Sequence, residues 1–392
     1  MSQQGSAGEV LRAFFLLGIS SFGGPIAHLG YFRREFVDRR RWVSEEEYAN
    51  LLALCQFLPG PASSQVGFCL GLQRAGWLGG LAAWCGFTLP SALLMFLAGH
   101  WAAALQSHPI TRGALHGLQL AAVAVVAQAV WLMARSLCPD LARRITALLA
   151  TGIALALPGT TGQLLVLIFG TLFGLTFLPA PPALSQAPGP GKIRRTASIL
   201  IATIFLALLL VAFLAPKTGW LALFAAFYRA GALVFGGGHV VLPLLKDAVV
   251  TPGWISPSLF LAGYGAAQAL PGPLFTVAAF FGTIASVGPE GALGAAIATI
   301  AIFLPGLLLA AACLPYWQAI RHHPRIAAAL KGVNAAVVGL LVAALVNLLQ
   351  LHAILALQDL GLLIAALLLL TLLRTPPIIV VLLCAACGAA LG

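Results

Sequence analysis

The sequence QFLPGPASSQ, residues 56–65, decides the fold, because it places a Pro-Gly-Pro break inside a chain that is otherwise apolar enough for lipid. The break returns in altered form in QALPGPLFT, residues 268–276. Proline and glycine together end one helix, and a proline in the first turn suits the start of the next. At membrane depth such a break is tolerated only where protein or a water-filled cavity covers the freed backbone groups. The two breaks therefore predict a lined site and indicate a transporter.

The composition predicts an all-α polytopic membrane protein. Of the 392 residues, 61% are hydrophobic and only 8% are charged, with a mean hydropathy of +1.01. A soluble domain carries about 25% charged residues. Apolar runs near the length of a membrane helix recur along the chain. The net charge of +11 comes from short basic clusters between these runs, which is typical of cytoplasmic loops facing anionic lipid and not of nucleic-acid binding.

The cysteines and the N-terminus predict neither a cofactor nor a cleaved signal. Cys384 and Cys387 form a CxxC inside a terminal apolar helix, with no histidine or acidic cluster nearby. We therefore interpret them as small buried hydrophobic residues and expect no metal site and no cofactor. The first apolar run, Val10–Phe22, has no basic leader and no small-residue cleavage site, so we expect it to be retained.

Two pairs of short apolar arms predict helical hairpins. Val10–Phe22 and Ile26–Val37 flank Gly23-Gly24-Pro25, and each arm spans only roughly 19 Å of a core about 30 Å thick. Arginines lie at the outer ends of both arms, which favours the cytoplasm and hence a re-entrant hairpin. The next hairpin is capped by Ser44, turns at the Pro-Gly-Pro break and returns to Arg74.

Matched landmarks predict an internal repeat. Phe235-Gly236-Gly237-Gly238 corresponds to Phe22-Gly23-Gly24-Pro25, at an offset that stays between 212 and 215 residues for the other pairs as well. The other pairs are the two Pro-Gly-Pro breaks, Trp42-Val43-Ser44 with Trp254-Ile255-Ser256, Leu89-Pro90 with Leu304-Pro305, and His108-Pro109 with His323-Pro324. We therefore expect an N-terminal repeat at residues 1–178, a basic linker rich in proline and glycine at 179–198, and a C-terminal repeat at 199–392.

The number of spans predicts that the second repeat is inverted. Five full spans separate the two hairpin pairs, so the second half begins on the opposite side of the membrane. With the N-terminus in the cytoplasm, 17 of the 21 basic residues fall inside; the others are Arg112, Lys217, Arg229 and Lys246. Nine full spans and four hairpins are expected. The spans are Trp77–Leu105, Gly113–Ala134, Ile145–Leu157, Gln163–Phe177, Ile199–Ala215, Gly291–Pro315, Ile326–Leu349, Leu357–Leu373 and Pro377–Leu391.

The helix starts after the breaks are candidate anion sites, because their free N–H groups and positive dipole ends point toward the membrane midplane. Hydroxyls and amides near the breaks add donors, including Gln65. The alternative for each polar residue is an ordinary hydrogen bond between helices. The candidate substrate-binding residues are Gly23, Gly24, Pro25, Gln56, Pro59, Gly60, Pro61, Ser63, Ser64, Gly236, Gly237, Gly238, Gln268, Pro271, Gly272, Pro273 and Thr276.

Other polar and charged residues are candidates for more than one role. His28 and His239 follow the Gly-rich tips at non-equivalent positions and are candidates for proton coupling, with a structural hydrogen bond as the alternative. Arg229 is a candidate for attracting anions to an outer vestibule. Lys246 and Asp247 are expected to form an interfacial ion pair, and the roles of Asn334 and Asn347 stay open.

At the level of motifs the chain resembles chromate ion transporters. FGGPIAHLGYFRREFVDRRRWVSEEEYANLLALCQFLPGP, residues 22–61, resembles the first domain of that family, and FGGGHVVLPLLKDAVV with AQALPGP, residues 235–250 and 267–273, resembles the second. The resemblance covers the chain as the long, two-domain form. It implies chromate export across the inner membrane, sulfate as a competitor, and the proton motive force or anion exchange as the drive. It assigns function to residues 22–25, 56–61, 235–238 and 268–273. Asp247 stands where the family pattern has glutamate.

Other function classes fit less well. A transporter of sulfate or another oxyanion would use the same donors. An intramembrane enzyme would need paired acids or metal ligands at depth, and nearly every Asp and Glu lies at a predicted interface, so we expect no enzymatic activity. A passive anion channel is a weaker alternative. The expected partners are chromate or sulfate and membrane lipid, with no nucleic acid, in a multi-pass protein of the inner (plasma) membrane. The sequence leaves open whether the chain acts alone or as a homodimer.

Overall fold

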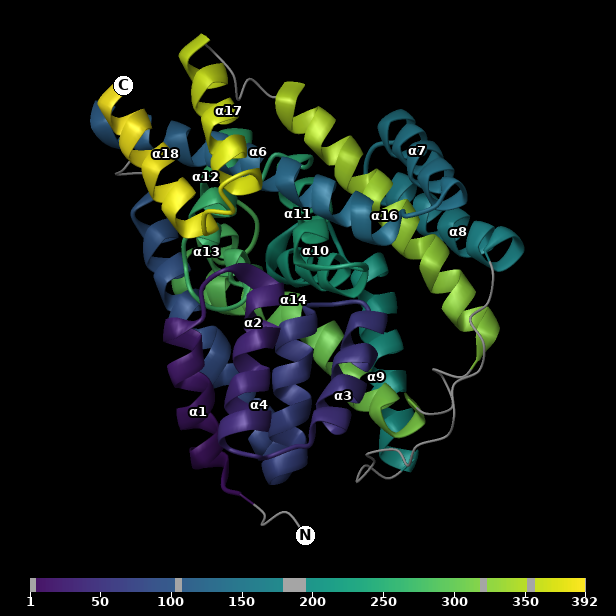
Figure 1. The fold of residues 1–392 in the computed structure, drawn as a ribbon. Coiled ribbons are helices and arrows are strands. Elements are labelled where there is room, and N and C mark those ends of the chain that lie inside the picture. The colour runs from purple at the N-terminus through teal and green to yellow at the C-terminus, as the bar shows by residue number, and fades with distance from the viewer. Residues whose placement is uncertain (1–4, 103–107, 179–194, 318–322, 351–356, 392) are drawn as a thin grey trace. The chain divides into compact units, whose positions relative to one another are not determined.

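The structure, a computed structural model, describes residues 5–102, 108–178, 195–317, 323–350 and 357–391, and every regular element in these ranges is a helix (Figure 1). The expected all-α fold is confirmed. The predicted linker lies outside the described residues up to position 194. A helix occurs at each of the nine predicted spans within the described ranges, as expected for a multi-pass membrane protein.

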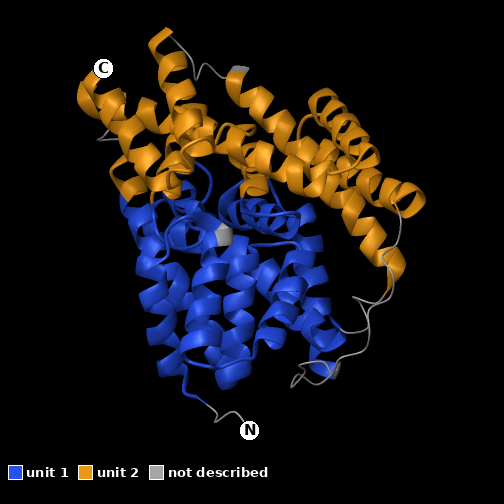
Figure 2. Cartoon of the chain, in the orientation of Figure 1, with its two compact units in different colours: residues 1–97, 185–238, 270–321 blue, residues 98–184, 239–269, 322–392 orange. Residues whose placement is uncertain are grey.

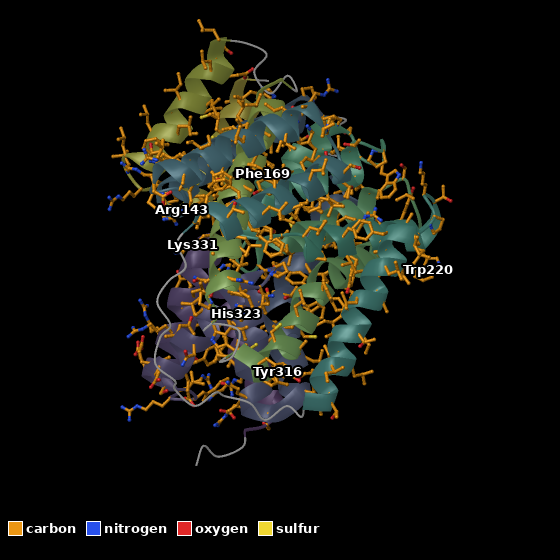
Figure 3. All side chains as sticks on the ribbon, turned by 90° about the vertical axis from the view of Figure 1, so that its right-hand side faces the viewer. Arg143, Phe169, Trp220, Tyr316, His323 and Lys331 are labelled. Atoms are coloured by element: carbon orange, nitrogen blue, oxygen red, sulfur yellow. The ribbon has the colours of Figure 1, made fainter. Side chains whose placement is uncertain are left out.

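Six helices are long and apolar enough to cross a membrane. Their apolar stretches are Ala62–His100, Pro109–Leu137, Thr160–Phe177, Thr196–Leu214, Gly291–Tyr316 and Pro324–Leu349. The helices at three predicted spans are shorter, namely α7 (Leu141–Ala156), α17 (Leu357–Thr371) and α18 (Pro377–Leu391). Large apolar side chains are exposed to the surroundings. Examples are Leu214, at the end of the stretch Thr196–Leu214, at 75%, and Trp220, labelled in Figure 3, at 60%. Contiguous exposed apolar surface of this kind suits contact with lipid.

The chain forms two compact units, and each takes stretches from both sequence halves (Figure 2). Unit 1 comprises residues 1–97, 185–238 and 270–321, and unit 2 comprises residues 98–184, 239–269 and 322–392. Each unit therefore combines helices of the N-terminal and C-terminal halves.

Unit 1 holds both Pro-Gly-Pro breaks and the Gly-rich breaks that precede α2 and residue 239. Its helices are α1 (Ala7–Ser20), α2 (Gly24–Arg33), α3 (Glu45–Phe57), most of α4 (Ala62–His100), α9 (Arg195–Leu214), α10 (Gly219–Ala232), α13 (Val277–Ile284) and α14 (Gly291–Cys313). A π-helical turn, Arg34–Arg39, follows α2. Ser44 forms the predicted cap of α3, as a full capping box with Glu47.

The α4 segment is two helical arms, because Ala75 and Gly76 leave helical geometry between them. The arms lie against each other at two glycines: a Cβ on Gly71 would overlap the carbonyl of Gly79, and a Cβ on Gly79 would overlap the carbonyl of Gly71. Small residues allow such close backbone approach between membrane helices. The chain therefore turns at Ala75 and Gly76, directly after Arg74.

The second arm of α4 and helix α14 occupy corresponding places in unit 1. Gly18 of α1 lies against the carbonyls of Gly86 and Phe87 on α4. In the second half, Gly231 of α10 lies against the carbonyl of Ile302 on α14. Each contact joins the helix before a Gly-rich break to the helix that carries the matched proline, so the two halves repeat the same packing.

Unit 2 pairs helices from different halves. Its helices are α6 (Pro109–Leu137), α7, α8 (Thr160–Phe177), α11 (Val241–Leu245), α12 (Pro257–Gln268), α16 (Pro324–Gln350), α17 and α18, with a π-helical turn at Lys246–Val250. Helix α6 packs on α18, and α16 packs on α8 and α7. Figure 3 labels Arg143, Phe169 and Lys331, which lie on α7, α8 and α16 respectively.

Candidate functional site

The first Pro-Gly-Pro break separates α3 from α4 and is held by a residue of the other half. Gly60 has φ +121°, a conformation that favours glycine. Its N–H donates to the carbonyl of Val234 at 2.8 Å. A Cβ on Gly60 would lie 2.9 Å from Cα of Gly306. We call this arrangement of Gly60, Val234 and Gly306 the Gly60 junction.

The second Pro-Gly-Pro break follows α12 and is held in the same way by the first half. Gly272 has φ +91°, and its N–H donates to the carbonyl of Ser21 at 3.0 Å. A Cβ on Gly272 would lie 2.7 Å from Oγ of Ser91 and 3.2 Å from the carbonyl of Phe87. We call this arrangement of Gly272, Ser21 and Ser91 the Gly272 junction.

The two junctions are reciprocal. Ser21 and Val234 each stand directly before a Gly-rich break, so each Pro-Gly-Pro break is bonded to the Gly-rich break of the other half. Ser91 and Gly306 each follow a matched proline, Pro90 or Pro305. The four breaks predicted from the sequence are thus joined in two crossed pairs within unit 1.

The glutamine that closes the first break is Gln65, and Gln56 is exposed on α3. Gln65 is fully buried, and its Nε2 donates to the carbonyls of Pro59 (2.9 Å) and Gly306 (3.0 Å). Gln268 is half-buried at the end of α12, and its Nε2 has no hydrogen-bond partner.

The predicted hydroxyls are all buried. Ser63 is 3% exposed, and Ser64 is 2% exposed with no hydrogen-bond partner for its Oγ. Thr276 donates to the carbonyl of Pro273 at 2.8 Å, within the same break. Ser64 is therefore the predicted hydroxyl whose donor capacity is unused.

The Gly-rich breaks have the conformations that the sequence requires. Gly23 and Gly24 have φ +103° and +76°, and Gly236 and Gly237 have φ +79° and +132°. Gly238 then begins a short 3-10 turn. Helix α2 begins at Gly24 with a proline in its first turn, so its N–H groups are free to face a ligand.

The two histidines have different surroundings. His28 is 1% exposed, and its Nε2 donates to the carbonyl of Ser21 at 3.2 Å, while its ring packs edge-on against Phe87. Its Nδ1 has no hydrogen-bond partner. His239 belongs to unit 2, where Nδ1 lies 3.1 Å from the hydroxyl of Tyr264. His28 is thus part of the Gly272 junction, and His239 contacts α12.

The charged candidates lie elsewhere. Arg229 is half-buried on α10 and donates to the carbonyl of Ala212 on α9. Asp247 accepts from Nε2 of Gln163 at 2.5 Å and from the hydroxyl of Thr251, and among the described residues it makes no ion pair with Lys246. Lys246 and Asp247 attract each other through their charges, but within the described ranges they make no direct ion-pair contact, and the carboxylate is bonded to Gln163 of α8. A small cavity beside Asp247 also has Asn347 in its lining.

Two features of the structure were not predicted from the sequence. Ser91, which lies next to Gly272, and Thr88, three residues earlier on α4, are fully buried, and the repeat of Leu89-Pro90 was the signal that could have drawn attention to them. Unit 2 also contains a cavity of about 640 Å³, where His116 lies 2.9 Å from Asp359. No sequence pattern linked these two residues, which are far apart in the chain. Within the described ranges no group of three or more His, Cys, Asp or Glu side chains could hold a metal ion.

The sequence matches one family of known proteins twice. The sequence profile of that family, described as chromate transporter, matches residues 8–175 and again residues 221–389. A chromate transport protein of Pseudomonas aeruginosa is 31% identical over 346 residues, covering 88% of this chain and 82% of the relative. A probable chromate transport protein of Synechococcus elongatus is 32% identical over 353 residues, covering 87% and 84% respectively.

A third relative is more distant. A chromate transport protein of Cupriavidus metallidurans is 28% identical over 373 residues, covering 91% of this chain and 87% of the relative. No solved structure matches the chain. The matches span nearly all the helices that build the two junctions, and they include both Pro-Gly-Pro breaks. The chain therefore belongs to the chromate transporter family.

Proposed function

We propose that the chain is a secondary transporter that exports chromate, a tetrahedral divalent oxyanion, across the inner membrane. The drive would be the proton motive force or exchange for another anion. The N-terminus would lie in the cytoplasm. The names of the relatives support chromate as the substrate, because three of them are called chromate transport proteins.

The observation that carries the proposal is the pair of crossed junctions. Each brings a positive-φ glycine, a Pro-Gly-Pro break and a Gly-rich break into one place inside unit 1. Backbone N–H groups at helix starts bind oxyanions without a metal ion, through hydrogen bonds and the positive end of the helix dipole. A dianion could therefore be bound without a permanent positive charge beside it. It could then be released again, as transport requires.

The proposed site uses the residues of the four breaks. The Gly-rich breaks would present the N–H groups of Gly24 and Gly237, and the Pro-Gly-Pro breaks those of Gly60 and Gly272. Buried hydroxyls such as Ser64 would donate to the remaining anion oxygens. Arg229, which lies on the helix before the second Gly-rich break, would attract anions from the outer side.

We further propose that the two halves are inverted repeats and that the broken helices are re-entrant. The double match to one family profile supports the repeat, and the reciprocal hydrogen bonds support a two-fold relation between the halves. The arginine-rich segment at residues 33–41 would lie on the cytoplasmic side of the membrane if the hairpins are re-entrant. A cysteine placed at Arg34 should be labelled by a membrane-impermeant thiol reagent only from the cytoplasmic side. Labelling from the outside would refute the re-entrant geometry.

The function is tested in everted membrane vesicles that contain the protein. Chromate should accumulate in these vesicles, and an imposed pH gradient or a preloaded anion should change the rate. Unlabelled sulfate should compete if the site recognises tetrahedral dianions generally. Accumulation of sulfate without chromate would favour the sulfate transporter. Absence of uptake of both anions would contradict the proposal.

A further inference from the structure

The two junctions share a backbone arrangement but differ in their side chains. At the offsets that align the repeats, Ser21 corresponds to Val234 and Ser91 corresponds to Gly306. Two further pairs lie next to these positions: His28 corresponds to Val241, and Thr88 corresponds to Phe303. The Gly272 junction is therefore polar at Ser21 and Ser91, where the Gly60 junction has a valine and a glycine, and the repeat positions of His28 and Thr88 carry a valine and a phenylalanine.

The polar side chains at the Gly272 junction are shielded from solvent. Ser21, Thr88 and Ser91 are 0% exposed, and His28 is 1% exposed. Thr88 and Ser91 lie three residues apart and hence on one face of α4. That face meets the second break, since Oγ of Ser91 would touch a Cβ on Gly272. His28 reaches the same place from α2 through its bond to Ser21.

Three of these side chains have unused hydrogen-bonding atoms. Oγ of Ser21, Oγ1 of Thr88 and Nδ1 of His28 have no hydrogen-bond partner among the described residues. Buried polar atoms are rarely left unsatisfied, and a specific case calls for an explanation. A threonine within a helix can ordinarily donate its hydroxyl to the carbonyl one turn earlier. The hydroxyl of Thr88 does not make even this usual bond, so its donor is available to a ligand.

The Gly60 junction is closed by its own residues. Gln65 spans it with two hydrogen bonds from Nε2, one to Pro59 and one to Gly306. Val234, the counterpart of Ser21, is apolar and fully buried, whereas the buried Oγ of Ser64 beside this break has no hydrogen-bond partner among the described residues. The N–H of the glycine is engaged at both junctions, but at the Gly60 junction the side chain of Gln65 also holds the carbonyl of Gly306.

We propose that the Gly272 junction is the oxyanion-binding site of the transporter and that the Gly60 junction is a structural lock. This rests on the proposed transport function and narrows its site from four breaks to one crossed pair. Opening of the Gly272 junction would free the N–H of Gly272 and direct the hydroxyls of Ser21, Thr88 and Ser91 to the anion. Because Nε2 of His28 donates to Ser21, Nδ1 carries a proton only in the imidazolium. That form would add a donor and a positive charge.

The test uses isosteric removal of the unused hydroxyls in the full-length protein. Thr88→Val and Ser21→Ala should each raise the KM for chromate by about ten- to a hundredfold, the loss expected for one hydrogen bond to a charged ligand. Neither should lower the midpoint temperature of unfolding, because each removes a buried hydroxyl that has no partner in the empty protein. Thr88→Ser, which keeps the hydroxyl, should restore a KM near that of the wild type.

The matched control lies at the other junction. Val234→Thr replaces one methyl group by a hydroxyl of similar size at the position equivalent to Ser21. It should leave the KM for chromate unchanged. A wild-type KM for Thr88→Val and Ser21→Ala would overturn the proposal, and so would an equal rise in KM for Val234→Thr. A fall in unfolding temperature in Thr88→Val and Ser21→Ala would assign the hydroxyls a structural role instead.

A binding measurement separates this inference from the proposed transport. Chromate should raise the unfolding temperature of the purified wild type in detergent, and Thr88→Val should abolish the rise. If the wild type transports no anion but shows this Thr88-dependent rise, the site assignment stands and the transport proposal fails. If chromate transport is present and the chromate-induced rise is the same in Thr88→Val as in the wild type, the site assignment fails.

Discussion

At the residue scale, Gly60 and Gly272 hold the two junctions, and the sequence predicts their positions but not their partners. The Pro-Gly-Pro motif shows where the helices break, because proline and glycine act locally. Nothing local in the sequence indicates that Gly60 is bonded to Val234, or Gly272 to Ser21. For the same reason the sequence pointed to Gln56, which repeats beside the break, when Gln65 is the side chain that closes it.

Alanine at either junction glycine should destabilise the protein. Gly60→Ala and Gly272→Ala combine a positive φ, which costs about 1–3 kcal/mol, with a close contact to the neighbouring helix. Gly76→Ala is the matched control, because Gly76 has φ +66° and an added Cβ meets nothing within 4 Å. The unfolding temperature in detergent should fall more for the junction variants than for the control.

The contact with Ser91 can be tested separately from the backbone strain. Adding Ser91→Gly to Gly272→Ala reproduces the glycine found at the equivalent place in the Gly60 junction and removes the Oγ that the new Cβ would meet. The double variant should recover part of the lost stability. Equal stability of Gly60→Ala, Gly272→Ala and Gly76→Ala would show that the junctions are not tightly packed.

Acid should weaken the segment between α2 and α3 through Glu35. Burial alone would raise the pKa of Glu35, but hydrogen bonds and charges from Arg39 and Arg40 outweigh it and hold the pKa below its usual range. A lowered pKa in the folded state stabilises the protein above the unfolded pKa of about 4.3, and this contribution is lost as the pH falls through the folded value. The unfolding temperature of the wild type should therefore decline below about pH 4 more steeply than that of Glu35→Gln. Parallel curves would contradict this role for Glu35.

At the element scale, small residues determine how the helices of unit 2 pair. Gly113 and Gly117 of α6 lie against Gly388 and Cys384 of α18. At the repeat offset these contacts correspond to those of α16 with α8, where Gly332 meets Gly170 and Ala328 meets Gly174. The helices could be predicted from their apolar length, but the exchange of partners between halves could not, because the small residues are spread over many helices of the chain.

A large side chain at the contact between α6 and α18 should separate the two helices. Gly117→Leu would place its side chain against the carbonyl of Cys384 and should destabilise the protein by about 1–3 kcal/mol or more. Gly152→Leu on α7 is the control, since an added Cβ there meets nothing within 4 Å. Thermal unfolding and gel filtration in detergent compare the two. An unaffected Gly117→Leu would contradict the packing.

At the scale of the whole molecule, each compact unit is assembled from both halves of the sequence. The repeat itself could be predicted, because five landmark pairs kept a steady offset. The sequence predicts two repeats joined by a linker, but it does not indicate which helices of the two repeats pack together. Helix α6 of the first half packs on α18, and α16 of the second half packs on α8, an exchange that only contacts between distant residues reveal.

The halves should therefore fold together and not alone. Residues 1–178 and 179–392, produced as separate chains in one cell, should associate and restore chromate transport, because α6 needs α18 and α16 needs α8. Either chain produced alone should be degraded or aggregate. Affinity purification of a tagged half with its partner checks the association. A single half that is monodisperse and unfolds cooperatively would contradict the exchange of helices.

The most direct test of the central claim is counterflow in proteoliposomes that contain the purified protein. Vesicles preloaded with unlabelled chromate should take up labelled chromate transiently above its equilibrium level, because the carrier exchanges one bound oxyanion for another. Preloading with sulfate should support the same transient if sulfate is also a substrate. Equilibration without a transient overshoot would indicate a passive channel, and no exchange of either anion would contradict the account.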